Sequence, residues 1–195
     1  MNRKLYLFDF DGTITNKDTL FDFLNFTFPT TYNSVFIKYI PLFIATKFKL
    51  IKAEEVKRKF INSFLKNKNR EEIEILADNY FENRKNIIIR PEALKYITNL
   101  SKEENKYIVT ASLDLWVKPF ANYLGLRLIS TKADFDGNIF HGKFKTPNCN
   151  YKEKVERIVK EIQLSQFNEI YAFGDTKGDK YMLELATHPH FRYFE

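Results

Sequence analysis

The sequence predicts an α/β protein with three layers, in which helices cover both faces of a parallel sheet and an all-helical segment is inserted near the start of the chain. Residues 4–8 are a short apolar run, typical of a buried strand. Residues 91–195 alternate strand-like runs with helical segments, the pattern of a parallel sheet with right-handed crossovers. We therefore expect a core of residues 1–15 and 91–195 and a helical cap of residues 16–90.

The cap segment has apolar residues at helical spacing. Two stretches, 53–65 and 71–81, each place four apolar residues on one helical face: Val56, Phe60, Ile61 and Phe64 in the first, and Ile73, Leu76, Ala77 and Tyr80 in the second. The apolar stretch 35–51 contains three lysines and is too interrupted to span a membrane. We expect it to be either a cap helix packed on the core or an amphipathic helix at a membrane surface.

The second part of the chain has the pattern of the core. Pro91 suits the first turn of a helix, and Gly125 is placed to end another. The residues Asp136-Gly137-Asn138 separate two short apolar stretches, as a hairpin turn would. We expect helices at 92–100, 114–124, 152–162 and 180–186, and strands at 107–109, 126–130, 170–173 and 191–194.

The composition is that of a globular protein with one compact domain and an insertion, since the chain has 195 residues, 44% hydrophobic and 29% charged. Cys149 is the only cysteine, which excludes an intramolecular disulfide and fits a reducing compartment. The N-terminus leads straight into a strand and lacks a signal-peptide pattern. We expect a cytoplasmic protein, with peripheral contact at the inner membrane face as a further option.

The positive charge is concentrated in the cap. Between Lys38 and Arg70 there are ten Lys or Arg and two acids, so this stretch is near +8 and the rest of the chain near −2. Such a segment attracts an anionic substrate or an anionic membrane surface, or it is a solvated lysine-rich face. No nucleic-acid-reading module is recognisable, and we expect no nucleic-acid partner and no obligate protein partner.

Two carboxylates follow the first strand, in the stretch Asp9-Phe10-Asp11-Gly12-Thr13. They would share one face if the strand continued, and like charges at one point are usually offset by a bound divalent cation. Gly12 allows a sharp turn, and Thr13 can donate to an anion. The stretch predicts phosphate chemistry around Mg2+, with an ordinary Asx turn as the alternative.

Three further groups of polar residues lie at strand ends or helix starts. Thr110-Ala111-Ser112 follows a strand, where a hydroxyl and main-chain N–H groups can hold phosphate oxygens. Lys154, near the start of its helix, can neutralise a phosphoryl group. Asp175 and Asp179 lie in the stretch Gly174-Asp175-Thr176-Lys177-Gly178-Asp179, after another strand. Such strand ends can converge at one edge of a parallel sheet.

In this order, the four groups resemble the motifs of the haloacid dehalogenase (HAD) superfamily of phosphohydrolases, and the resemblance covers nearly the whole chain. The stretches 148–155 and 182–189 are similar to the branch that contains phosphoserine phosphatases and bacterial phosphatidylglycerophosphatases of the C type. In that branch a helical cap follows the first motif, which matches residues 16–90. The resemblance implies a HAD-like core with a Rossmann-like sheet and a Mg2+-dependent phosphomonoester hydrolase.

The resemblance also implies roles for the acidic residues. Asp9 would attack phosphorus and form an aspartyl-phosphate. Asp11 would protonate the leaving alkoxide and then deprotonate the attacking water. Mg2+ would be held by the Asp9 carboxylate, the main-chain carbonyl of Asp11 and the Asp175 carboxylate. Asp179 would either bind the metal through water or position Lys154, and the resemblance favours the second role.

The remaining motif residues would bind the phosphoryl group. Lys154 would balance its charge, and Thr110 with the Ala111 amide would orient it. Lys152 is an alternative to Lys154, and Ser112 is an alternative to Thr110 as the phosphate hydroxyl. For Asp179, the alternative is an N-cap of the following helix.

The cap is expected to determine the substrate. Asp18 falls where phosphoserine phosphatases have a cap acid that contacts the substrate amine, which makes it a candidate substrate residue. The bulky apolar residues in 19–51 fit a lipid head-group phosphate better than a small polar substrate, and they equally fit a tightly packed cap. The partner is therefore a phosphorylated small molecule or a lipid head group. An inactive binding scaffold is the remaining alternative.

Overall fold

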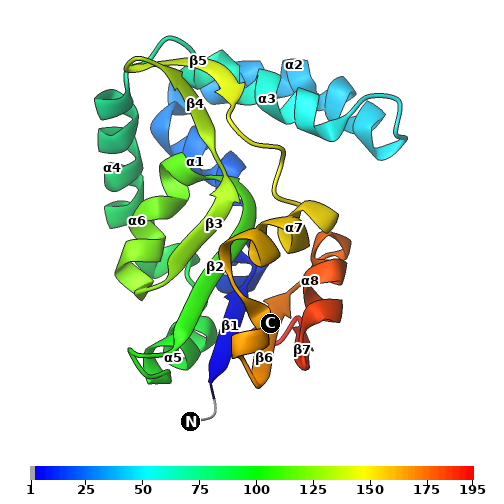
Figure 1. Cartoon of the computed structure of the whole chain (residues 1–195). Coiled ribbons are helices and arrows are strands. Elements are labelled where there is room, and N and C mark those ends of the chain that lie inside the picture. Colours follow the sequence, from blue (N-terminus) through cyan, green and yellow to red (C-terminus); the bar gives the residue numbers. More distant parts are fainter. Residues whose placement is uncertain (1–2) are drawn as a thin grey trace.

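The computed structural model describes residues 3–195, so residues 1 and 2 of the expected core lie outside the described residues. A sheet of five strands has the order β3-β2-β1-β6-β7, and all neighbouring strands are parallel. Figure 1 shows β1 near the middle of this sheet. The strands are β1 (Lys4–Phe8), β2 (Asn105–Leu113), β3 (Arg127–Thr131), β6 (Glu169–Gly174) and β7 (His188–Phe191).

Helices cover both faces of the sheet, which confirms the expected α/β class. Along β1, Tyr6 and Phe8 belong to one buried apolar cluster, and Leu5 and Leu7 belong to the other. This follows from the alternation of side chains along a strand. The first cluster includes residues of α5 (Pro91–Asn99) and α6 (Asp114–Leu124), and the second includes residues of α7 (Lys152–Glu161) and α8 (Lys180–Leu185).

Four helices within residues 16–90 lie beyond the carboxyl ends of the strands (Figure 1). A short turn, Phe10–Ile14, connects β1 to them. None of the helices in residues 3–195 is both long and apolar enough to cross a membrane. The four helices are α1 (Thr19–Thr27), α2 (Pro29–Lys47), α3 (Ala53–Leu65) and α4 (Arg70–Ile88).

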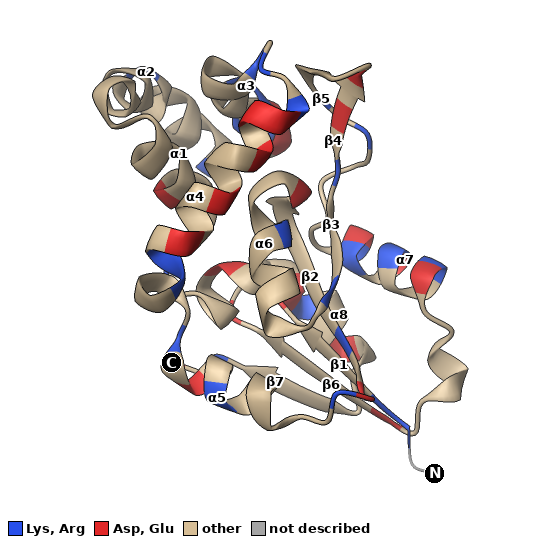
Figure 2. Ribbon diagram, turned by 90° about the vertical axis from the view of Figure 1, so that its left-hand side faces the viewer, with Lys and Arg blue, Asp and Glu red and all other residues tan. Residues whose placement is uncertain are grey.

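A hairpin from the second part of the chain packs against these helices. Its strands, β4 (Ala133–Asp136) and β5 (Ile139–Phe144), form a separate antiparallel pair, as the turn residues predict. Figure 2 shows β5 beside α3. The main-chain N–H of Asn67 donates to the carbonyl oxygen of Phe140 at 2.8 Å, so the hairpin is bonded to the α3–α4 connection.

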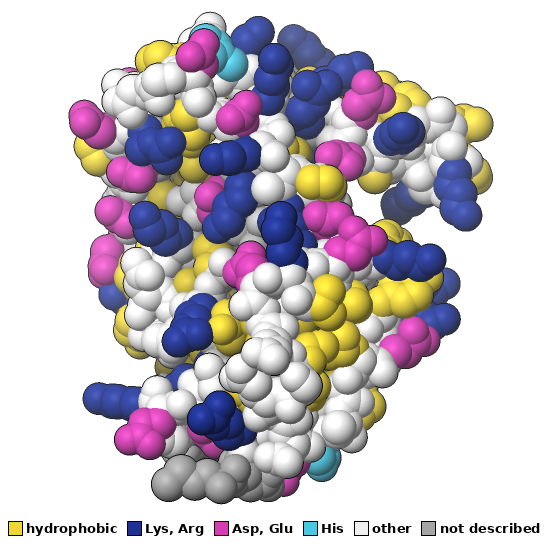
Figure 3. All heavy atoms as spheres, viewed as in Figure 1, with side chains coloured by type: hydrophobic (Ala, Val, Ile, Leu, Met, Phe, Trp, Pro, Cys, Tyr) yellow, Lys and Arg dark blue, Asp and Glu magenta, His cyan; other side chains and the backbone are white. Residues whose placement is uncertain are grey.

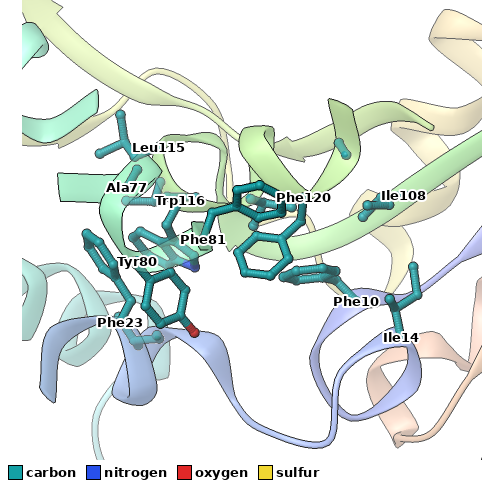
Figure 4. Packing of buried hydrophobic residues seen from close by; sticks show 14 of the residues in the cluster. Phe10, Ile14, Phe23, Ala77, Tyr80, Phe81, Ile108, Leu115, Trp116 and Phe120 are labelled. Carbon is teal, nitrogen blue, oxygen red and sulfur yellow. The ribbon is translucent and has the colours of Figure 1, made fainter. Parts of the chain in front are cut away.

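Aromatic side chains join the helices of residues 16–90 to the core (Figure 4). The ring of Phe23 on α1 stacks on Trp116 of α6 at 5.3 Å, and Phe10 meets Phe120 edge-on at 5.4 Å. Tyr80 and Phe81 of α4 also contact the Phe120 ring, at 5.8 and 4.9 Å. The many aromatic residues of this chain therefore contribute in large part to a bulky interior.

The prediction of a last strand at 191–194 is wrong. The strand β7 is His188–Phe191, and Arg192 has a φ of +55°, a left-handed conformation that ends it. Phe194 is 4% exposed and stacks on Phe173 at 5.2 Å, so it closes the end of the sheet from one face. The apolar residues at 191–194 suggested a strand, but Phe194 is apolar because it packs on a face of the sheet, not because it forms a strand of the sheet.

We expect Phe120→Ala to lower the free energy of unfolding by about 3–5 kcal/mol, because the change leaves a cavity between the three rings that surround this side chain. Urea unfolding measures the loss. Ile75→Ala is the control, because Ile75 is 68% exposed and its truncation is expected to change stability by less than about 0.5 kcal/mol. Equal losses in both variants would contradict the packing described here.

Candidate active site

The chain changes direction across the sheet at β1, which has β2 on one side and β6 on the other. The carboxyl end of β1 is therefore a topological switch point, where open α/β sheets bind ligands. The main-chain N–H of Asp9 donates to the carbonyl oxygen of Phe173 at 2.8 Å, which keeps β1 and β6 together up to the motif. Asp9, Thr110 and Asp175 consequently line one cavity.

Lys154 lies between two carboxylates below this edge of the sheet. Its ammonium nitrogen is 2.5 Å from Asp9 Oδ1, 2.6 Å from Asp179 Oδ1 and 2.7 Å from the carbonyl oxygen of Val109. The side chain is 1% exposed. Lys152, the alternative in the sequence, is exposed, and its ammonium lies 5.7 Å from the centre of the Tyr181 ring. The structure therefore places Lys154, not Lys152, beside Asp9.

Burial governs the protonation of this ion pair. It raises the pKa of the Asp9 carboxyl to about 8, and Asp179 and Asp11 add to the rise, whereas Lys154 opposes it. Burial also acts against the charged form of Lys154, but Asp9 and Asp179 outweigh it, and the pKa of the ammonium is raised. The Lys154 side chain therefore stays positively charged. A further cation beside Asp9 would lower the pKa of the Asp9 carboxyl and favour its ionised form.

Both carboxylate oxygens of Asp179 are bonded within the protein. Oδ1 accepts from Lys154, and Oδ2 accepts from the N–H and the hydroxyl of Thr176, both at 3.0 Å. Asp179 stands at the N-cap position of α8, as the alternative predicts, but its side chain makes no cap bond to that helix. A Cβ on Gly174 would lie 2.5 Å from the Cβ of Asp179, so only glycine allows this approach.

Three carboxylates form a group that could hold a metal ion. Oxygen atoms of Asp9, Asp175 and Asp179 all lie within 4.8 Å of one another. The Thr13 hydroxyl is 3.4 Å from Asp9 Oδ2 and 3.3 Å from Asp175 Oδ1. A Cβ on Gly12, whose φ is +85°, would lie 2.3 Å from Asp175 Oδ2. The all-oxygen donor set fits a hard cation such as Mg2+.

Asp11 is held apart from that group by residues of both the cap and the core. Its Oδ1 accepts from the N–H and hydroxyl of Thr19, at 2.7 and 2.5 Å, and its Oδ2 is 2.6 Å from the Ser112 hydroxyl. The Trp116 indole N–H donates to the Thr19 hydroxyl at 3.1 Å. Because an indole can only donate, the Thr19 hydroxyl proton goes to Asp11. That the main-chain carbonyl oxygen of Asp11 binds the metal ion stays a prediction.

The segment Thr110-Ala111-Ser112 lines the same cavity, but it lies within β2, where the pairing with β3 is irregular, and not after the strand as predicted. Thr110 and Ser112 are buried, at 1% and 3% exposed, and the Ser112 N–H donates to the Thr110 hydroxyl at 3.0 Å. The Thr110 hydroxyl is also 3.5 Å from Asp11 Oδ2. Both candidate hydroxyls therefore lie against Asp11, and Ser112 makes the shorter contact.

The cavity has a volume of about 550 Å3 and lies between the strand ends and the cap helices. Its lining combines the acids with the apolar residues Leu20, Phe21 and Phe43. Asp18 also lines it and caps α1 by accepting from the N–H of Leu20 at 3.1 Å. Burial raises the pKa of Asp18 to about 6, Asp11 adds to the rise, and Lys57 opposes it.

Lys57 is a cavity residue that sequence analysis did not identify. Its ammonium donates to the carbonyl oxygen of Ala111 at 2.7 Å and lies 3.4 Å from Asn148 Oδ1, so it joins α3 to the core. Burial lowers the pKa of this ammonium, whereas Asp11 and Asp18 raise it. In the sequence, Lys57 is one of ten basic residues in a short stretch, and nothing but the fold distinguishes it.

A family model for haloacid dehalogenase-like hydrolases matches residues 6–184. The chain belongs to the haloacid dehalogenase-like hydrolases. The curated relatives of this hydrolase include Protein CicA of Caulobacter vibrioides (strain NA1000 / CB15N), which is 34% identical over 194 residues, a match that covers 97% of this chain and 86% of the relative. The expected superfamily is thus confirmed.

Solved structures share the fold of this hydrolase. A Bordetella pertussis Tohama I protein of unknown function has a TM-score of 0.84 at 21% identity, covering 96% of this chain and 88% of its own. A substrate-bound phosphoserine phosphatase has a TM-score of 0.67 at 21% identity, with coverages of 95% and 84%. A phospho-aspartyl intermediate analogue of phosphoserine phosphatase has a TM-score of 0.66 at 22% identity, with the same coverages.

We expect Lys154→Met to lower the free energy of unfolding by about 3–5 kcal/mol above about pH 8, because it leaves two buried carboxylates without their cation. The loss should shrink as the pH falls below about 8, since a protonated Asp9 needs no counter-charge. Urea unfolding across pH, in EDTA, measures both effects.

The matched control is Lys152→Met, which removes the same charge two residues away at an exposed position. It should change stability by less than about 0.5 kcal/mol at every pH. Two variants with the same stability would show that the buried ion pair does not support the fold.

Proposed function

We propose that this hydrolase cleaves phosphomonoesters in a Mg2+-dependent reaction, with Asp9 as the nucleophile and Asp11 as the general acid and base. The proposal rests on the convergence at one sheet edge of Asp9, paired with buried Lys154, and of Asp11, held separately. Two neighbouring carboxylates with different surroundings are suited to different roles in one reaction.

The first half of the reaction transfers the phosphoryl group to the protein. An oxygen of the Asp9 carboxylate attacks phosphorus, and the bond from phosphorus to the ester oxygen breaks. The leaving alkoxide takes a proton from the Asp11 carboxyl group, whose Oδ1 accepts from both donors of Thr19 and whose Oδ2 lies 2.6 Å from the Ser112 hydroxyl. Lys154 stays charged beside Asp9 and balances the negative charge that develops on the phosphoryl oxygens.

The second half releases phosphate. Water gives a proton to the Asp11 carboxylate and attacks phosphorus, and the bond between phosphorus and the Asp9 oxygen breaks. Inorganic phosphate leaves, and Asp11 is again protonated for the next cycle. Thr19 and Trp116 act through Asp11, as positioning residues that hold its carboxyl group at the cavity.

Asp9 and Asp175 would hold Mg2+, together with the main-chain carbonyl of Asp11. When bound, the ion would supply positive charge beside the phosphoryl oxygens and the nucleophile. Asp179 fits a positioning role better than a ligand role, because Lys154 and Thr176 already occupy both of its oxygens. Thr110, the Ala111 amide and Ser112 are the proposed phosphate-binding groups, since all three residues line the cavity.

A lipid phosphate is a second candidate substrate, beside small soluble phosphate esters. The observation that favours it is the apolar part of the cavity lining, which includes Leu20, Phe21 and Phe43. Asp18 and Lys57, which also line the cavity, favour instead a substrate with charged groups beyond the phosphate. A direct comparison of substrates separates these two candidates.

We expect phosphate release that requires Mg2+, stops with EDTA and falls by about a thousandfold or more in Asp9→Asn, because an amide cannot act as the nucleophile. The measurement is phosphate release from phosphoserine, phosphatidylglycerophosphate and a broad set of other phosphomonoesters. The preferred substrate decides between the soluble and the lipid candidate.

Lys152→Met serves as the control for folding and purification, since Lys152 is exposed and outside the cavity. If folded protein loaded with Mg2+ releases no phosphate from any ester, the proposed activity is wrong and the binding-scaffold alternative gains support. Full activity in Asp9→Asn would instead refute Asp9 as the nucleophile.

We expect the apparent affinity for Mg2+ to rise by up to about tenfold per pH unit below about pH 8 and to level off above it, because the ion must displace the Asp9 proton. Calorimetric titration of Mg2+ from about pH 6 to about pH 9 measures this dependence. In Asp9→Asn the slope should disappear. A slope that is absent from the unchanged protein would contradict binding of the ion at Asp9.

A further inference from the structure

The helix α2 is apolar on two sides but packed on only one. Its inner side carries the aromatic residues Phe36, Tyr39 and Phe43, and the rings of Tyr39 and Phe43 lie 5.2 and 5.3 Å from the ring of Phe60 on α3. A helix that is apolar all round normally has other elements on all its sides. The second apolar side of α2 has no such cover within residues 3–195.

The uncovered side carries a row of exposed apolar residues. Three of them, on α2, follow one another at intervals of three and four positions, which places them on one helical face. Phe48, the C-cap residue, comes four positions later, and Leu50 lies just beyond the end of the helix. We call these five residues the outer stripe, and their exposed fractions are high: Ile37 64%, Ile40 39%, Ile44 50%, Phe48 73% and Leu50 77%.

Positive charge surrounds the outer stripe. Lys38, Lys47, Lys49 and Lys52 are all exposed, and the sequence from residue 23 to residue 53 contains no Asp or Glu. Figure 2 shows α2 without acidic residues, and Figure 3 shows Lys or Arg side chains and hydrophobic side chains together at the projecting end of α2 and α3. An exposed apolar stripe with flanking lysines is the pattern of a helix that lies in a membrane interface.

We propose that the outer stripe and its lysines dock on the surface of an anionic lipid bilayer. The apolar side chains would enter the boundary between head groups and acyl chains, and the lysines would pair with anionic head groups. A second copy of this chain is a poorer occupant, because stripe-to-stripe contact would bring two sets of lysines together without acids between them.

Docking would place the cavity close to the bilayer. Phe43 and Thr46, which line the cavity, lie on the same part of α2 as Ile44 and Phe48 of the outer stripe. Figure 3 shows the molecule hollowed below the projecting end of α2 and α3. The docking surface itself does not depend on the reaction proposed above, and it can be tested with protein that is catalytically inactive.

The test is flotation of the full chain with vesicles of phosphatidylcholine alone or of phosphatidylcholine with phosphatidylglycerol. We expect binding to the anionic vesicles that weakens as salt is raised, and little binding to the neutral ones. Ile40→Glu with Ile44→Glu should lower the partition coefficient by at least about tenfold, since each buried apolar side chain contributes about that factor. Lys47→Ala with Lys49→Ala should lower it by roughly tenfold or more.

Two matched controls use the same substitutions elsewhere. Ile75→Glu with Ile87→Glu changes two residues of α4 that are 68% and 56% exposed, and Lys102→Ala with Lys118→Ala removes two exposed charges of the core. Both controls should bind anionic vesicles as the unchanged protein does, and circular dichroism should show the same fold in all variants.

Three results would overturn the proposal. The first is equal binding to neutral and anionic vesicles, and the second is full binding by the Ile40→Glu, Ile44→Glu variant. The third is an unchanged protein that binds no vesicles but forms a dimer, where the Ile40→Glu, Ile44→Glu variant does not dimerise. That result would assign the outer stripe to contact with a second copy of the chain. Phosphate release from a soluble ester is measured in parallel, so a failure of the catalytic proposal is distinguishable from a failure of docking.

Discussion

The ion pairs of Lys154 are the interaction on which the rest of the site depends. A buried ammonium between two carboxylates costs desolvation energy that only close, well-directed partners offset. The partners come from different elements: Asp9 follows β1, Asp179 precedes α8, and Lys154 is near the start of α7. The charge balance thus connects three segments that are far apart in the sequence, and it fixes the position of Asp9.

The sheet core and the strand-end motifs could be predicted because local sequence determines them. Apolar runs followed by Asp9 or Asp175 indicate buried strands with polar ends, and the structure brings both residues to one cavity. The sequence offered two candidates for the phosphate-binding lysine, Lys152 and Lys154. Their positions near the start of the helix did not distinguish them. That choice required the direction of the helix relative to the sheet, which is a long-range property.

Other features were beyond the sequence for similar reasons. The hydrogen bond from Trp116 to Thr19, and from there to Asp11, joins residues that are 97 positions apart, and no local pattern marks it. The contact of Lys57 with Ala111 joins α3 to the end of β2, and it depends on how the cap lies over the core. The strand at 188–191 was misplaced because packing onto a sheet face and membership of a sheet give the same apolar pattern.

The hairpin β4–β5 forms main-chain hydrogen bonds with only one end of the cap. Main-chain hydrogen bonds join Asn67 and Lys68 to Phe140, and Arg70 to Asn138, so this end of the helical segment shares a small antiparallel connection with the core chain. The turn between α2 and α3, at the other end, has no strand beside it within residues 3–195. Within the described residues, the cavity can therefore widen at the α2–α3 turn without breaking a main-chain hydrogen bond to the core, whereas widening beside the hairpin would break three.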